Sequence, residues 1–182
     1  MSRINYSEIV VIDLEATCWS TPEETALNAS EIIEVGVCVL DTFSGEIRMP
    51  QGIIVKPTRS KVSQFCYEIT NISQDMVDDG VSFEDAIKTL KSDYKVSQKI
   101  MAGYGNYDQN MFAKECARNG VKPPFGPTYL NISSLATLKL KAGKRLDLAE
   151  TCRQFGLIFE GRQHRGVDDA VMAAKVLWEC IK

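Results

Sequence analysis

Two carboxylates, Asp13 and Glu15, stand two residues apart at the end of an apolar run near the start of the chain. If residues 10–15 form a β-strand, both side chains project from the same face, because successive side chains of a strand alternate between faces. Two negative charges at that separation raise each other's pKa and destabilise the fold unless a cation lies between them. Residues 9–19 contain no Lys or Arg, so the pair indicates a site for a divalent metal ion. The alternative for this pair alone is a strand end that meets solvent.

Further carboxylates occupy positions where ligand groups collect in α/β proteins. Asp108 follows an apolar strand and the turn 103–106, where a helix is expected to begin. Its alternative role is to cap that helix, because carboxylates at a helix N-terminus are stabilised by free N–H groups and by the helix dipole. Asp168 and Asp169 lie in the first turn expected for the last helix.

The loop before those two aspartates contains His164, the only histidine of the chain. Arginines and glycines flank it, so we expect a mobile and partly exposed side chain, and a surface histidine without a role is the alternative. If this loop lies near Asp13, the chain assembles four carboxylates and one imidazole. That set suits the hydrolysis of a phosphodiester by two metal ions with a histidine as general base.

The elements that must position these residues follow from the apolar patterns. Strands are predicted at residues 10–15, 31–41, 46–56, 99–103 and 129–132, and the third is either one strand or two short strands broken near Pro50 and Gly52. Helices are predicted at residues 62–70, 73–77, 82–94, 107–119, 133–140, 146–155 and 168–181, and residues 20–30 are expected to form a loop. Because short turns join the first three strands, an antiparallel meander is favoured. The pattern predicts an α/β protein with a mixed sheet, a central first strand and helices on its faces.

The composition favours one globular domain over residues 1–182, with 45% apolar and 25% charged residues. No segment has the features of a signal peptide or a transmembrane helix, so we expect a cytoplasmic protein without a membrane partner. The six cysteines form no CxxC pair and are expected to be free thiols in a reducing compartment. The net charge of −3 includes the carboxylates of the predicted metal site, so it does not exclude a nucleic acid held locally at that site.

The order of these motifs resembles a known family. An Asp-x-Glu near the N-terminus, a middle Asp that begins a helix and a His-x-x-x-x-Asp near the C-terminus are similar to the DEDDh exonucleases of the DnaQ-like, ribonuclease H-like superfamily. Five segments resemble the Eri-type branch of this family, which comprises 3′ to 5′ exonucleases that trim RNA ends. They are VIDLEATCW, EIIEVGV, SQFCYEITNIS, Tyr107-Asp108 and EGRQHRGVDDA. The resemblance covers roughly residues 8–181. It implies a ribonuclease H-like fold with a mixed five-stranded sheet whose first three strands are antiparallel.

The resemblance also implies a role for each motif residue. Two Mg²⁺ or Mn²⁺ ions are expected at the four carboxylates Asp13, Glu15, Asp108 and Asp169. His164 would be the general base, whereas a tyrosine there would have marked the sister DEDDy group. The spacing from His164 selects Asp169 over Asp168, which is then expected to be an N-cap or a support for the ligands. Glu31 and Glu34 fall in a matched strand but outside the metal set, and we expect structural roles for them.

Substrate contacts follow from the same resemblance. Phe65 and Tyr107 match aromatic positions that stack on the terminal base in the Eri-type branch, although Tyr107 replaces the usual tryptophan and should stack more weakly. The alternative is that both are core aromatics. Backbone groups of Ala16 and Thr17 would face the terminal sugar. The chain also contains one dense basic cluster, which comprises Lys139, Lys141, Lys144 and Arg145. This cluster either guides the nucleic-acid strand or is a solvated helix end.

The expected function is therefore a 3′ to 5′ exonuclease that releases nucleoside 5′-monophosphates from RNA 3′ ends. Because the chain begins almost at its first strand, we expect single-stranded ends or short overhangs as substrates. Some Eri-type proteins carry an extra nucleic-acid-binding segment before this domain. A DNA exonuclease of the proofreading or repair type would share every catalytic residue and is the alternative among enzymes. A nucleic-acid-binding module that has lost activity is the alternative outside enzymes.

Overall fold

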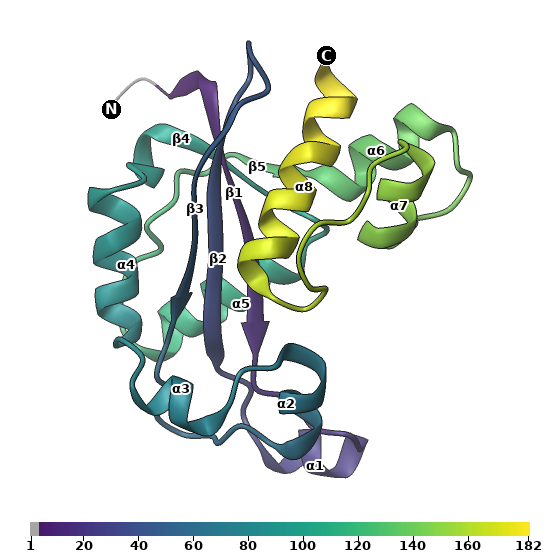
Figure 1. The fold of residues 1–182 in the computed structure, drawn as a ribbon. Helices are drawn as coiled ribbons and strands as arrows, with labels where there is room; N and C mark the ends of the chain where they lie inside the picture. The colour runs from purple at the N-terminus through teal and green to yellow at the C-terminus, as the bar shows by residue number, and fades with distance from the viewer. Residues whose placement is uncertain (1–3) are drawn as a thin grey trace.

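Five strands of the described residues, 4–182, form one mixed sheet in the computed structural model (Figure 1). Their bounds are β1 (Asn5–Ala16), β2 (Ile32–Asp41), β3 (Ile47–Ile54), β4 (Lys99–Gly103) and β5 (Tyr129–Asn131). The order across the sheet is β3-β2-β1-β4-β5. β2 pairs antiparallel with β1 and β3, whereas β4 pairs parallel with β1 and β5. The predicted mixed sheet, its antiparallel first three strands and its central first strand are confirmed.

Helices cover both faces of this sheet and one of its ends (Figure 1). One face is covered by α4 (Phe83–Ser92) and α5 (Tyr107–Arg118), and the other by α6 (Ile132–Leu140), α7 (Leu148–Gln154) and α8 (Gly166–Ile181). The end of the sheet where β1 stops is flanked by the short helices α1 (Pro22–Leu27), α2 (Gln64–Thr70) and α3 (Gln74–Asp78). A 3-10 turn (Val96–Gln98) leads into β4. None of the helices within residues 4–182 has the length and apolarity that crossing a membrane requires.

The central strand β1 contributes to the cores on both sides of the sheet. The even-numbered residues 10–14 pack with α4 and α5, whereas Ile9 and Val11 pack with α6, α7 and α8. This division follows from the alternation of side chains along a strand. Asp13 and Glu15 continue the series of Ile9 and Val11, so the α8 face of the strand changes from apolar to acidic near its end.

Several predicted boundaries are wrong. The first strand, predicted over residues 10–15, begins at Asn5. Residues 20–30, expected to form a loop, contain α1, which begins with a capping box between Thr21 and Glu24. Every residue of α1 is exposed, so the helix has no apolar period that a sequence pattern could reveal. The last helix, predicted to begin at Asp168, begins at Gly166 with Arg165 as its N-cap.

The third strand is one continuous element, which resolves the alternative left open by Pro50. β3 lies at the edge of the sheet, where a residue without an N–H is tolerated. The register with β2 shifts between Val37 and Val39, and Met49 beside the proline has a φ of 55°.

The six cysteines are free thiols, as predicted, and four of them are buried: Cys38, Cys66, Cys116 and Cys152.

Candidate active site

The five residues of the predicted catalytic motif line one cavity of about 510 Å³. Its walls come from the end of β1, from α2, α5 and α7, and from the loop before α8. The structure thus brings together residues from three distant parts of the chain, namely Asp13, Glu15, Asp108, His164 and Asp169. Their roles as metal ligands and as general base remain predictions.

Two glycines let the start of α8 approach β1. Gly36 stands opposite Asp13 in the ladder between β1 and β2, and a Cβ at Gly36 would lie 1.9 Å from the carbonyl carbon of Gly166. A Cβ at Gly166 would lie 3.0 Å from the carbonyl oxygen of Asp13. Any larger residue would push the helix away from the strand. The two glycines therefore bring Asp169, in the first turn of α8, to the acidic end of β1.

Asp108 is tied to the same strand by a hydrogen bond. Its Oδ1 accepts from the backbone N of Leu14 at 3.0 Å, and the residue is 4% exposed. The N-cap of α5 is Asn106, and Asp108 lies in the first turn that follows. The N-cap position suggested as an alternative therefore belongs to another residue, and the buried carboxylate of Asp108 is held at the end of β1.

The loop of residues 161–165 places His164 next to Asp169. The backbone N of His164 donates to Asp169 Oδ2 at 2.7 Å, and His164 adopts a φ of 62°. The backbone N of Arg162 donates to Asp168 Oδ2 at 2.9 Å. Asp168 is therefore not the N-cap of α8, and its carboxylate orders the loop instead. The His164 side chain stays exposed, in agreement with the expectation from its flanking residues.

Glu34 anchors the other end of this loop. It is fully buried, accepts a hydrogen bond from Gly166 N at 3.0 Å and pairs with Arg165 Nε at 3.2 Å. Glu34 also stands opposite Glu15 in the β1–β2 ladder. The Arg165 charge therefore offsets part of the repulsion between these two carboxylates. The structural role expected for Glu34 is confirmed.

The motif carboxylates repel one another in a poorly solvated site. Burial and then the charges of Asp108 and Asp169 raise the pKa of Asp13 well above its usual value. Burial and the charge of Asp169 raise the pKa of Glu15 to about 8. Burial also raises the pKa of Asp108 and of Asp169 to about 6, against the opposite effect of their backbone hydrogen bonds. Without a cation, the cluster therefore retains protons near neutral pH.

This donor set fits divalent metal ions. Carboxylate oxygens are the ligands that Mg²⁺ and Mn²⁺ prefer, and positive charge would relieve the repulsion that now raises the pKa values. Glu15, His164 and Asp169 each offer one ligand atom, and these atoms lie within 4.8 Å of one another. The geometry therefore allows His164 to act either as a ligand or as a base.

The predicted substrate residues lie in different environments. Ala16 and Tyr107 line the cavity, whereas Phe65 lies outside its wall, to which Ile69 contributes from one turn later in α2. Tyr107 is 58% and Phe65 37% exposed, so the alternative of two core aromatics is wrong. Thr17 is fully buried, and its backbone N–H already donates to the carbonyl of residue 31 at 2.9 Å. That N–H is therefore not free to bind a sugar.

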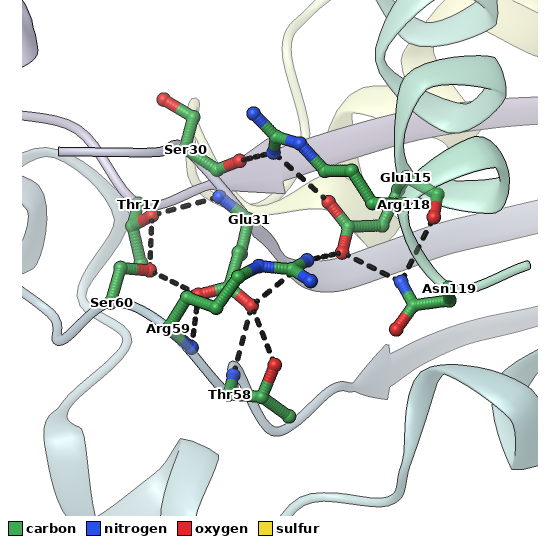
Figure 2. Close-up of polar contacts among 9 residues, drawn as sticks. All are labelled: Thr17, Ser30, Glu31, Thr58, Arg59, Ser60, Glu115, Arg118 and Asn119. Atoms are coloured by element: carbon green, nitrogen blue, oxygen red, sulfur yellow. Dashed lines mark hydrogen bonds and ion pairs between the residues drawn. The ribbon is translucent and has the colours of Figure 1, made fainter.

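A partly buried polar network holds Thr17 directly after β1 (Figure 2). Thr17 Oγ1 accepts from Glu31 N at 3.0 Å and lies 3.0 Å from Ser60 Oγ. Ser60 Oγ donates to the Glu31 carboxylate at 2.7 Å. Arg59 bridges the Glu31 and Glu115 carboxylates, at 3.3 and 2.7 Å respectively. The network connects the segment after β1 to α5, which confirms a structural role for Glu31.

Sequence reasoning missed several residues that line the cavity, including Asp147, Ile69 and Phe159. Asp147 is the N-cap of α7 and accepts from Glu150 N at 2.7 Å. An Asp directly before a helical segment is a capping signal that the sequence contains. That signal identifies a helix start but does not reveal that it faces the cavity.

Comparisons with known proteins agree with this site. The family model RNase_T, described as Exonuclease, matches residues 10–177. The chain is similar to human 3'-5' exoribonuclease 1, with 30% identity over 183 residues that cover 94% of this chain and 51% of that protein. It is also 27% identical to mouse ERI1 exoribonuclease 2 over 201 residues, which cover 97% of this chain and 29% of that protein. The chain therefore spans about half or less of the length of these two relatives.

A solved structure extends the similarity to three dimensions. The nuclease domain of 3'hExo, a DEDDh family member bound to rAMP, superposes with a TM-score of 0.85 at 27% identity. The match covers 98% of this chain and 93% of that domain. The predicted resemblance to the Eri-type branch of the DEDDh nucleases is confirmed by these relatives. The chain belongs to the exonuclease family whose model spans residues 10–177.

Proposed function

We propose that this protein is a metal-dependent 3′ to 5′ exonuclease that releases nucleoside 5′-monophosphates from single-stranded or short-overhang 3′ ends, with RNA as the preferred substrate. The observation that carries the proposal is the cavity in which four mutually repelling carboxylates meet an exposed histidine. The relatives named as exoribonucleases support the choice of RNA.

The four motif carboxylates would hold two Mg²⁺ or Mn²⁺ ions. When bound, such ions lower the pKa of a water molecule and neutralise charge on the phosphodiester. His164 would accept the proton of the attacking water, because its exposed imidazole can take up a proton and release it to solvent. Its backbone N–H, donated to Asp169, would keep it beside the reacting phosphate. Tyr107, exposed at the rim, would stack on the terminal base.

A direct test uses 5′-labelled single-stranded RNA and DNA of one sequence, incubated with the protein and Mn²⁺. We expect a ladder of products shortened from the 3′ end, formed faster from RNA. A much faster DNA ladder would favour the proofreading or repair type of exonuclease. RNA binding without release of mononucleotides would favour the silent binding module.

The role of His164 is tested by His164→Ala. We expect turnover to fall by about 10²- to 10⁴-fold, the usual contribution of a general base, with Mn²⁺ binding measured by calorimetry unchanged. Loss of Mn²⁺ binding in this variant would mean that His164 is a ligand. Glu84→Ala, on the exposed side of α4, serves as a control that should leave both quantities unchanged.

A further inference from the structure

An open groove adjoins the active-site cavity where α5, β5 and α6 meet. Its volume is about 580 Å³, and its lining includes Asn106, Tyr107, Asn110, Asn131, Ser134 and Arg145. Tyr107 lines the cavity as well as the groove, so the two spaces meet at this side chain. A chain bound in the cavity can therefore continue past Tyr107 into the groove.

The groove differs in chemistry from the cavity. Within residues 4–182 its lining contains no carboxylate, whereas the cavity is lined by five. Amides, hydroxyls and one guanidinium take their place in the groove. These groups hydrogen-bond the phosphates and sugars of nucleic acid, and they do so without reading the base sequence.

Two asparagines are held in fixed positions at the groove. Asn131 Oδ1 accepts from Ser134 N at 3.0 Å as the N-cap of α6, and Asn131 Nδ2 donates to Asn106 Oδ1 at 2.9 Å. Among the described residues, Asn106 Nδ2 and the side-chain amide of the exposed Asn110 have no protein partner. These donors are therefore available to a ligand.

Arg145 supplies the positive charge. It is exposed, and its only hydrogen bond within the described residues is a long one, 3.4 Å from Nη2 to the carbonyl of Tyr104. Its guanidinium packs against Gly105, where a Cβ would lie 2.7 Å from Nη2. No carboxylate of residues 4–182 forms an ion pair with Arg145. An arginine held in this way next to the metal-ligand cluster is free to pair with a phosphate.

The substrate of a 3′ to 5′ exonuclease always extends on the 5′ side of the bond that is cleaved, so some surface next to the cavity must carry that part of the strand. The wall at the start of α7 presents Asp147, and α2 presents the exposed Glu68 beside Ile69. Both carboxylates would repel a phosphate backbone. Arg162 also reaches the α2 side, where its guanidinium donates to the carbonyl of Glu68 at 3.2 Å. The groove past Tyr107 differs in that it combines donors and a cation with no carboxylate among its described lining residues.

We propose that this groove binds the nucleotides on the 5′ side of the scissile phosphodiester in a single strand, with Arg145 paired to a backbone phosphate and with Asn106 and Asn110 hydrogen-bonded to the backbone. The inference rests on the proposed function and adds the path of the strand. It predicts that substitutions in the groove raise KM for long substrates and leave KM unchanged for a substrate that has no upstream nucleotide.

The test compares an eight-nucleotide RNA with uridine 5′-monophosphate p-nitrophenyl ester, in which a nitrophenyl group replaces the upstream strand. For Arg145→Ala we expect KM for the RNA to rise about tenfold or more, the loss of one charged hydrogen bond, while KM for the ester is unchanged. The slope of log KM against log salt concentration should fall by about 0.7 for one lost phosphate contact. Lys144→Ala is the matched control, because it removes an exposed charge outside the groove.

Each further outcome decides the inference. Equal losses on RNA and ester, or losses on neither, would overturn it, as would an effect of Lys144→Ala as large as that of Arg145→Ala. Asn110→Leu tests the groove without removing charge and should raise KM for the RNA alone. If the wild type cleaves neither substrate, the proposed function fails, and the groove is then judged by anisotropy of a labelled phosphorothioate RNA with Ca²⁺. In that assay Arg145→Ala must weaken binding and Lys144→Ala must not.

Discussion

Two groups of carboxylates lie near the end of β1, one around Glu31 and one in the cavity, and they differ in how their charge is neutralised. Glu31 accepts hydrogen bonds from Thr58, Arg59 and Ser60 and pairs with the Arg59 guanidinium (Figure 2). Burial raises its pKa, but these hydrogen bonds outweigh burial and lower the pKa below its usual value. In the cavity, burial and repulsion raise the pKa of Asp13 and Glu15 instead.

This difference distinguishes carboxylates that stabilise the fold from carboxylates that line the candidate active site. A buried acid whose lone pairs are filled by protein donors has no capacity left for a ligand, and it stabilises the fold through its partners. A cluster of acids without protein cations costs stability in the metal-free protein and is retained where it binds a metal. Removing a carboxylate from the cavity should therefore stabilise the metal-free protein, whereas removing Glu31 should destabilise it.

The largest expected effect is on activity, in Asp13→Asn. We expect turnover to fall by about 10³-fold or more, because the charge of a proposed metal ligand is lost. In EDTA the same variant should melt at a higher temperature than the wild type, since folding no longer has to protonate this acid or hold its charge among the other carboxylates. Activity on labelled RNA and thermal unfolding measure the two effects. A lower melting temperature in EDTA would contradict the contrast drawn between the two groups.

The second effect is on stability, in Glu31→Ala. This change leaves the backbone N–H groups of Thr58 and Arg59 and part of the Arg59 charge without a partner. We expect the free energy of unfolding in urea to fall by about 1–3 kcal/mol, the cost of leaving part-buried N–H donors without an acceptor, because Arg59 is partly exposed and keeps Glu115 as a partner. Glu31→Gln, which keeps an acceptor, should lose less, and the exposed Glu84→Ala should change by about 0.5 kcal/mol at most. A Glu31→Ala protein as stable as wild type would mean that the network carries no stability.

The smallest expected effect is the pH dependence of the metal-free protein. Because the folded pKa of Glu15 is raised from 4.5 to about 8, the folded state binds this proton more tightly than the unfolded chain. The stability from this proton is present below about pH 4.5 and is lost as pH rises toward 8. Asp108 and Asp169 act in the same direction up to about pH 6.

The measurement is the melting temperature in EDTA between pH 5 and pH 8. It should fall with rising pH, and the fall should be smaller with Mn²⁺ or in Asp13→Asn, where the repulsion is reduced. An identical pH dependence in wild type and Asp13→Asn would argue against coupling among the cavity carboxylates.

Much of the site was predictable because its determinants are local. The alternation along β1 puts Asp13 and Glu15 on one face whatever the rest of the fold does. The apolar periods located the sheet strands and the large helices to within a few residues. α1 was not predicted because an exposed helix without a buried face has no such apolar period.

The sequence by itself determined the order and identity of the motif residues, and with them the fold class and the family. Only the tertiary structure decided which carboxylates are neutralised. That outcome depends on contacts between residues far apart in the chain, such as Arg59 with Glu115 and Arg165 with Glu34. It also decided the role of Asp168, which the sequence left open: its carboxylate holds the loop by accepting from Arg162 N, a contact that exists only once the loop folds back on α8.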